Sequence, residues 1–258
     1  MLKKITKNKK DFVKENCTWV IPKNKKISGN LESAQKILFM IDPQKYCRTR
    51  NFLDGAVTNL SAYIRHGILT LNEVRNYAIS QVDDPKKIEK FIQELAWREF
   101  WQRLYYSTPE IIWQDIEAYK TGFQANDYSN EMPNDIKEAK TKNAAINSFI
   151  YTLTDTGYLH NHARMYLASY IVHFRRIKWQ IGAKWMHHYL IDGDLASNNL
   201  SWQWIASTFS NKPYIFNLDN VKKYADDSID VSEKNNPELA FNYETLNIKL
   251  FPKKGLST

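Results

Sequence analysis

The sequence predicts an all-α, multi-helical protein, and three observations support this prediction. Apolar residues recur at helical spacing through most of the chain between residues 31 and 208. No segment shows the strict alternation typical of a strand, and only 8 glycines and 8 prolines are available for the turns of an all-β fold. With 43% hydrophobic and 14% aromatic residues, a chain of 258 residues can bury a substantial core.

The strength of the helical pattern divides the chain into three parts. Residues 1–30 are rich in Lys and Asn and predict an irregular basic tail. Residues 31–225 carry the apolar periodicity and predict one helical domain. Residues 226–258 are weakly patterned, so we expect a mostly irregular C-terminal segment.

Cap residues predict where the helices begin. Asn30 can cap a first helix over 31–41, and Thr70 with Glu73 has the spacing of a capping box. Asp84 and Thr108 each precede a proline, a residue suited to the first turn of a helix. A polar stretch at 120–142 predicts a loop, and further helices are expected at 144–154, 160–178, 183–190 and 195–208.

The chain is basic, with a net charge of +8 and a pI of about 9.2. Such a charge attracts phosphate-rich partners, among which nucleic acids are the commonest. A plainer alternative is a soluble protein with solvated lysines, because much of the excess lies in one terminal run. The run contains Lys3, Lys4, Lys7, Lys9 and Lys10.

Several function classes lack support. Cys17 and Cys47 give no metal-site spacing, and an iron–sulfur cluster held by thiolates needs about four cysteines. His160 and His162 stand at i, i+2 on an expected helix and point apart, so structural histidines are favoured over metal ligands. No Rossmann, P-loop, zinc-protease or serine-hydrolase motif is present. Without a signal peptide or a membrane-spanning stretch, we expect a cytoplasmic protein.

Two helix faces combine polar groups with flat or apolar ones. Glu94, Trp97 and Arg98 share one face and could grip a flat polar ligand, although their spacing alone favours a Glu94–Arg98 ion pair beside a core Trp. Arg164 lies one turn after Asn161 on an apolar helix. An unpaired buried charge is costly, so Arg164 needs an acidic partner, and the nearest plausible acids are those of the segment 192–194.

The densest polar cluster is the segment 191–199. Gly193 and Asp194 could simply cap two helices. Capping does not explain the two asparagines that follow, or the pair Trp202 and Trp204. Acceptors, amides and stacking rings together suit a heteroaromatic ligand such as a flavin or a nucleobase.

Two smaller features leave alternatives open. Thr58-Asn59-Leu60-Ser61 places small polar groups ahead of a short helical stretch, a pattern that favours anions but also fits an ordinary helix cap. Trp179 and Trp202 lie within helical pattern. They are either core residues or one-electron donors beside a redox cofactor, and spacing does not decide between these roles.

The segment 190–208 closely resembles the flavin-binding signature of DNA photolyases and cryptochromes. The segments 60–67, 94–100 and 156–165 resemble earlier motifs of this family, in the same order and with similar separations. Together the motifs cover about residues 46–225. The resemblance implies a helical domain that holds FAD folded into a U shape.

The resemblance also implies which residues bind the cofactor. Tyr46 and the turn 58–61 would lie at the phosphates, and Arg164 would pair with Asp192 beside the isoalloxazine. Asp192 and Asp194 would bind the flavin and ribose side, and Asn198 would face the flavin N5. The complete set is Tyr46, Thr58, Asn59, Leu60, Ser61, Arg164, Asp192, Gly193, Asp194 and Asn198.

The implied reaction is light-driven electron transfer to a flipped-out cyclobutane pyrimidine dimer in DNA. The residues implied in catalysis at the dimer cavity are Glu94, Trp97, Asn161, Met165, Asn198 and Trp204. Trp202 and Trp179 match two members of the family's electron-relay triad. The third position has no Trp, although Tyr119 and Tyr128 lie in that region.

The family's N-terminal antenna domain has no counterpart in this sequence, so we expect no antenna chromophore. Two alternative functions follow from this departure. One is a cryptochrome-like flavoprotein that senses light or redox state without repairing DNA. The other is an FAD-binding subunit of a larger assembly, in which a separate protein partner replaces the antenna domain.

Overall fold

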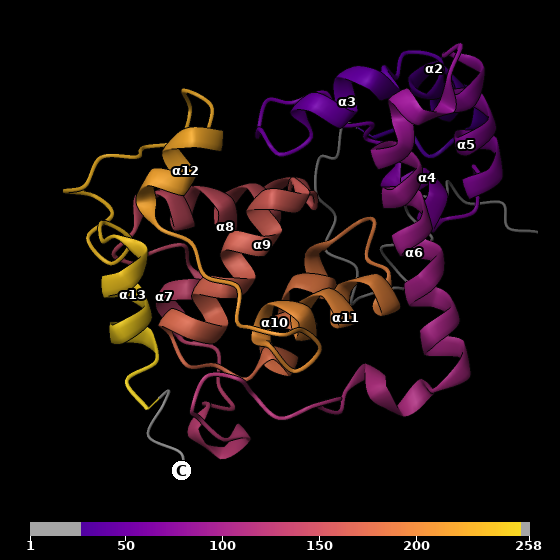
Figure 1. Ribbon diagram of the computed structural model, residues 1–258. Coiled ribbons are helices and arrows are strands. Elements are labelled where there is room, and N and C mark those ends of the chain that lie inside the picture. Colours follow the sequence, from indigo (N-terminus) through magenta and orange to yellow (C-terminus); the bar gives the residue numbers. More distant parts are fainter. Residues whose placement is uncertain (1–26, 254–258) are drawn as a thin grey trace, which may run out of the picture.

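The computed structural model describes residues 27–253, and every regular element in that range is a helix (Figure 1). The all-α prediction is therefore confirmed. The α-helices are α2 (Leu31–Leu38), α3 (Pro43–Thr49), α4 (Ser61–Arg65), α5 (Leu71–Ser80), α6 (Glu89–Ser107), α7 (Asn134–Lys137), α8 (Ala144–Thr156), α9 (Asn161–Ser169), α10 (Trp179–Tyr189), α11 (Leu195–Ala206), α12 (Leu218–Tyr224) and α13 (Tyr243–Leu250). Three 3-10 turns and one π-helical turn complete the set: η1 (Pro85–Ile88), η2 (Pro109–Ile112), η3 (Ala125–Asp127) and the π-helical η4 (Tyr170–Phe174).

The basic tail expected at 1–30 falls almost entirely outside the described residues. In the C-terminal segment expected to be mostly irregular, α13 is the single helix among the residues that the structure describes. No described helix is both long and apolar enough to cross a membrane.

Local signals placed most helix starts correctly. Thr70 caps α5, and its side chain and that of Glu73 bond reciprocally to each other's backbone N–H, which confirms the capping box. The helix expected over 160–178 differs: α9 runs into the π turn η4 and stops at Phe174. The chain leaves the helix because Arg176 has a left-handed backbone with φ of 51°.

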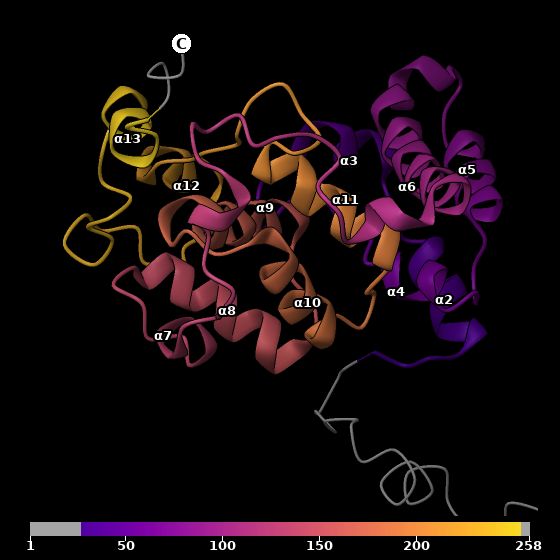
Figure 2. The same cartoon turned by 90° about the horizontal axis from the view of Figure 1, so that it is seen from below.

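Two large apolar clusters form most of the interior. The helices that enclose them lie on opposite sides of the molecule (Figures 1 and 2). Helices α2 to α6 enclose the smaller cluster, which is centred on residues such as Leu60, Ile88 and Phe91. Helices α8 to α12 enclose the larger one, around Tyr166 and Trp179. A third, smaller apolar cluster around Ile112, Ala196 and Leu200 joins the C-terminal half of α6 and η2 to α11. Helix α11 therefore packs against helices of both large clusters.

A glycine sets how closely α10 and α11 approach each other. The six-membered ring of Trp202 lies directly on Gly182, and a Cβ added there would be 2.3 Å from the indole Cζ3. Because of this contact, the Trp202 side chain lies between the two helices and is only 2% exposed. The close packing of α10 on α11 and the position of the Trp202 indole in the cavity lining therefore both depend on the absence of a side chain at Gly182.

We expect Gly182→Ala to destabilise the protein. Alanine favours a helix interior by about 1 kcal/mol over glycine, but forced overpacking of a core costs about 1–3 kcal/mol, and the rigid indole cannot move aside. Urea unfolding measures the difference. Gly29→Ala is the control, because no atom lies within 4 Å of a Cβ there. A Gly182→Ala protein as stable as wild type would contradict the packing described.

Candidate functional site

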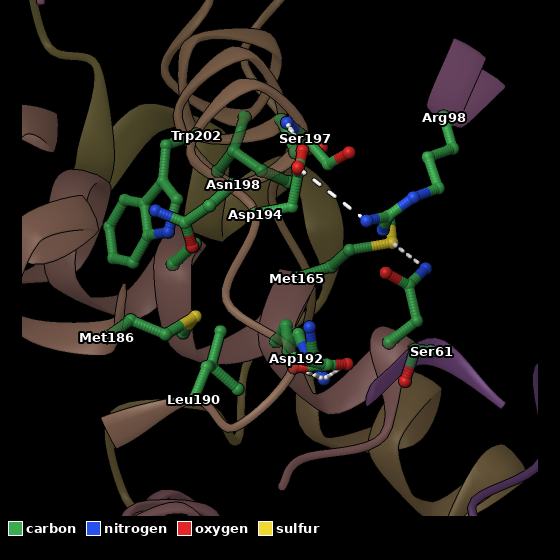
Figure 3. Close-up of a pocket in the computed structure, with 15 residues that line it drawn as sticks. Ser61, Arg98, Met165, Met186, Leu190, Asp192, Asp194, Ser197, Asn198 and Trp202 are labelled. Atoms are coloured by element: carbon green, nitrogen blue, oxygen red, sulfur yellow. Dashed lines mark hydrogen bonds and ion pairs between the residues drawn. The ribbon is translucent and has the colours of Figure 1, made fainter. Parts of the chain in front are cut away.

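A cavity opens between the two sides of the molecule and encloses about 660 Å³ of empty space, part of it open to solvent. Ser61 of α4 and Arg98 of α6 face α9, α10 and α11 across it (Figure 3). The remaining lining residues are Asn161, Arg164, Met165, Ala168, Met186, Leu190, Asp192, Asp194, Ser197, Asn198, Ser201, Trp202 and Ile205. The structure thus brings together eight residues predicted from sequence: Ser61, Asn161, Arg164, Met165, Asp192, Asp194, Asn198 and Trp202.

An ion pair forms one wall of the cavity. Arg164 Nη2 donates to both carboxylate oxygens of Asp192, at 2.8 and 3.0 Å, and its Nε donates to the Leu159 carbonyl at 2.7 Å. The Asp192 side chain is only 3% exposed. Burial alone would raise the pKa of this carboxyl, but the charge and hydrogen bonds of Arg164, helped by the Ser61 side chain, outweigh burial and lower the pKa below its ordinary value. Asp192 is therefore held as an anion.

Asp194 is a second buried acid, 7% exposed, with three partners. As the N-cap of α11 it accepts a hydrogen bond from the Ser197 backbone N–H at 2.7 Å. Its other oxygen lies 3.6 Å from Arg98 Nη2 and accepts a hydrogen bond from Gln102 Nε2. Arg98 and Gln102 are one turn apart on α6, so Asp194 joins the two sides of the molecule. Sequence patterns did not identify this contact.

The segment between α10 and α11 is also fastened to α4 through its backbone. Arg65 Nε donates to the Gly193 carbonyl at 2.6 Å, and His66 Nε2 lies 2.8 Å from the Ile191 carbonyl oxygen. The prediction that Gly193 caps a helix is wrong, because α10 ends at Tyr189 with Leu190 as its C-cap. A Cβ at 193 would make a tight contact of 3.1 Å with the Leu190 carbonyl oxygen.

Polar side chains of α11 supply hydrogen-bonding groups to the cavity. Asn198 Nδ2 donates to the Ala183 carbonyl at 3.1 Å and to Asn199 Oδ1 at 2.9 Å. Both amide hydrogens are then used, so the side-chain oxygen is the atom left for a ligand. The hydroxyl of Ser197 is buried and has no hydrogen-bond partner in the described part of the chain. A buried hydroxyl without a partner is costly and indicates a missing one.

The cavity wall formed by α9 is less polar than the wall formed by α11. Asn161 Nδ2 lies 3.9 Å from the sulfur of Met165, one helical turn further on. Ala168, Met186 and Ile205 make the surroundings apolar. A cavity with an apolar lining and a few fixed polar groups is typical of sites for small organic ligands.

Three residues predicted for catalysis lie outside this lining. Glu94 forms ion pairs with Arg50 at 3.4 Å and Lys90 at 3.2 Å, so the expected Glu94–Arg98 pair beside a core Trp is wrong. Trp97 is 43% exposed and stacks on the neighbouring indole of Trp101. Trp204 is 41% exposed and leans against Tyr214. Their functional roles stay predictions.

Most residues predicted at the phosphates are also absent from the cavity lining. Tyr46 packs edge-on against Phe91 in the smaller cluster, where burial raises the pKa of its phenol far above the ordinary value. Asn59 has a left-handed backbone with φ of 55°, and Leu60 is fully buried. Thr58 Oγ1 accepts a weak hydrogen bond from the Leu60 N–H. Only Ser61 of this turn reaches the cavity lining.

Each of the histidines 160 and 162 has a hydrogen-bond partner through Nδ1. His160 caps α9, and burial is the main cause that lowers its pKa to about 4. His162 Nδ1 lies 2.7 Å from the Asn51 carbonyl oxygen, and its ring stacks on Tyr166. Among the described residues, no group of His, Cys, Asp and Glu could hold a metal ion.

The helical arrangement defines the photolyase and cryptochrome fold. The structure superposes on a Synechocystis cryptochrome with a TM-score of 0.69 at 19% identity, over 89% of this chain and 52% of that one. It also superposes on a photolyase from Sulfolobus tokodaii with a TM-score of 0.65 at 25% identity, over 80% of this chain and 46% of that one.

The sequence comparison assigns the family. Residues 91–248 match the family described as the FAD binding domain of DNA photolyase, and the chain belongs to this family. Deoxyribodipyrimidine photo-lyases are among its relatives: that of a Synechococcus species is 30% identical over 229 residues, and that of Buchnera aphidicola is 35% identical over 201. The matches cover 81% and 75% of this chain, which spans less than half the length of either relative, 44% and 42%.

Removing Arg164 should destabilise the protein strongly. Breaking a buried ion pair leaves one charge unpaired and costs about 3–5 kcal/mol, and in Arg164→Ala that charge is Asp192. The free energy of unfolding in urea gives the value. The control is Arg103→Ala, which removes an exposed pair with Glu99 and should change stability by about 0–1 kcal/mol. Equal effects of the two substitutions would contradict a buried pair at Asp192.

The same pair predicts a pH dependence. The pKa of Asp192 is lowered in the folded protein, so its contribution to stability is complete above the ordinary Asp pKa of about 3.9 and is lost as pH falls through the folded pKa. In Arg164→Ala, burial without the cation raises this pKa instead. The stability gap between wild type and variant should therefore be largest near neutral pH and narrow in acid. A gap independent of pH between about 7 and 3 would contradict this.

Proposed function

We propose that the cavity binds FAD, with the isoalloxazine between Asn198 and the Arg164–Asp192 pair. The residues present fit such a group. Asp192 offers a fixed carboxylate, Arg164 a charged donor and Asn198 a free amide oxygen. The unpartnered hydroxyl of Ser197 supplies one further group. The convergence of these four side chains on one cavity is the observation that carries the proposal.

The adenine and phosphate part would extend toward α4. Ser61 lines the cavity there, and the turn before it is held open by the left-handed Asn59. Thr58, Leu60 and Tyr46 would contribute backbone or hydroxyl groups around this turn. Asp194 and Gly193 would bind the ribose side, because the Arg65 and His66 contacts hold their segment against α4.

For the activity, we propose light-driven repair of cyclobutane pyrimidine dimers in DNA. Bound flavin in its reduced form would supply the photoexcited electron, and the protein would bind, orient and screen the reactants. A basic chain and two half-exposed indoles, Trp97 and Trp204, suit an extruded pyrimidine dimer, because flipped bases stack on aromatic side chains. Asn161 and Met165 would contact the dimer from α9, and Glu94 would bind its polar edge. We also propose a cytoplasmic location.

Trp202 and Trp179 are proposed as electron donors that return the flavin to its reduced state. Trp202 lines the cavity, and Trp179 is fully buried one helical turn before the glycine on which Trp202 lies. The position of Trp202 in the cavity lining supports this role. Neither residue is required for dimer splitting itself once the flavin is reduced.

Loss of the carboxylate at 192 should weaken flavin binding. A hydrogen bond to a charged group contributes about 1.5–3 kcal/mol, or about 10- to 100-fold in Kd, so Asp192→Ala should be purified with little flavin. Absorbance near the flavin bands against protein concentration gives the occupancy, and Arg103→Ala is the control. Full occupancy in Asp192→Ala would remove Asp192 from the proposed site.

The repair proposal is tested with dimer-containing DNA, chemically reduced protein and blue light. Repair predicts light-dependent loss of dimers with wild-type protein and strongly reduced turnover with Trp204→Ala at equal flavin content. Persistence of dimers with full flavin occupancy would reject repair and favour a cryptochrome-like sensor. If dimers are lost only after a second protein from the same cells is added, the chain acts as a subunit of an assembly.

A further inference from the structure

Four aromatic rings are in contact beside the cavity, three on α6 and one after α11. Trp97 stacks on Trp101, one helical turn later, with 5.3 Å between ring centroids and 24° between planes. Phe100 contacts these two rings at 5.7 and 5.1 Å. Trp101 also meets the ring of Phe209 at 5.8 Å. The two rings that face solvent, Trp97 at 43% and Phe100 at 45% exposed, are therefore backed by the half-buried ring of Trp101.

Trp101 is the member of this group that is held from several sides. Its indole packs against the apolar cluster of Ile112, Ala196 and Leu200, which joins α6 to α11. These three neighbours are buried, so the position of the Trp101 ring is fixed by their packing. An exposed side chain without such support samples several rotamers. Because Trp97 stacks on the Trp101 ring, Trp101 determines the plane of the Trp97 indole.

The turn 207–210, which carries Phe209, is fastened to the end of α11. Ser207 is the C-cap of that helix and has a left-handed backbone with φ of 73°. Ser210 Oγ donates a hydrogen bond to the Trp204 carbonyl at 2.8 Å. The backbone that carries Phe209 therefore has a fixed position relative to Trp204, the second half-exposed indole.

Both half-exposed indoles are thus positioned from the same turn: Trp204 through α11, and Trp97 through Trp101 and Phe209. We propose that the Trp101–Phe209 contact sets the separation of the Trp97 and Trp204 indoles, and thereby makes the site selective for two linked pyrimidines over a single base. This proposal rests on the dimer site proposed above. Trp101 and Phe209 are positioning residues, because they act through the two exposed indoles.

The selectivity follows from the rigidity of the gap. A pyrimidine dimer presents two rings at once, whereas an undamaged flipped base presents one. Aromatic side chains bind a base by stacking at van der Waals distance, so a gap set for two rings leaves a single base without one of its stacking partners. A gap that could widen and narrow would fit both ligands, and the difference between their affinities would shrink.

The first measurement concerns the Trp97 ring itself. Fluorine NMR of protein labelled with fluorotryptophan reports on the indoles, and Trp97→Phe identifies the Trp97 signal. Trp101→Leu should move this signal toward that of a freely exposed indole, whereas Trp101→Tyr should keep it near its wild-type position because a ring remains behind it. An unchanged Trp97 signal in Trp101→Leu would overturn the proposal.

The second measurement is the ratio of affinities for an oligonucleotide that holds one dimer and for the same oligonucleotide undamaged, with FAD-loaded protein in darkness. Trp101→Leu should lower the ratio by about tenfold, as expected for one lost aromatic contact, and so should Phe209→Leu. The double variant should lose no more than the weaker of the two, because both substitutions break one contact. Tyr106→Leu on α6 is the matched control, since its ring is 89% exposed.

A plain packing role of the four rings predicts a different pattern. Trp101→Leu and Phe209→Leu would then lower the melting temperature while the affinity ratio stayed at its wild-type value, and this result would reject the proposal. Fully additive losses in the double variant would reject it as well. If Trp101→Leu fails to fold, Trp101→Tyr and Phe209→Leu still give the comparison, because only the second should lower the ratio.

Failure of this proposal is distinguishable from failure of the proposed function. A wild-type protein that prefers the dimer oligonucleotide but leaves dimers intact in blue light rejects repair and keeps the positioning role. A preference that survives unchanged in both Trp101→Leu and Phe209→Leu rejects only the positioning role. A wild-type protein that binds the two oligonucleotides equally rejects both.

Discussion

The Arg164–Asp192 pair is the interaction on which the site depends. A carboxylate that is 3% exposed must be either neutral or paired, and the guanidinium of α9 keeps it charged. Because Asp192 belongs to the segment that joins α10 to α11, the pair also fixes where both helices meet α9. The remaining cavity walls are positioned relative to this point.

The cavity exists because two apolar clusters meet without filling the space between them. Beside the cavity their junction is polar: Asp194 is contacted by Arg98 and Gln102 of α6, and Arg65 and His66 bind the segment 191–193. Such contacts are directional and leave room, whereas apolar side chains at the same junction would close it. A polar ligand between the clusters would therefore complete the packing and hold the two sides together.

Sequence reasoning succeeded where one physical rule decided the outcome. The cost of an unpaired buried charge predicted that Arg164 pairs with an acid of the segment 192–194, which is Asp192. The backbone donors of a helix start predicted the caps at Thr70 and Asp194. Sequence patterns gave the wrong partner where several charged neighbours compete for one side chain. Glu94 chose Arg50 and Lys90 over Arg98, because tertiary contacts override i,i+4 spacing. The Trp101–Phe209 contact joins distant segments and leaves no local pattern to detect.

The fastening of the segment 191–193 to α4 has an evolutionary consequence. Arg65 and His66 bind main-chain carbonyls, which every amino acid supplies, so the fastening does not depend on the side chain at position 191. A substitution at 191 therefore keeps the hydrogen bond from His66, whereas a Cβ at 193 would make a tight contact of 3.1 Å with the Leu190 carbonyl oxygen. Variation at 191 in a lineage would therefore signal tolerance rather than a change of ligand.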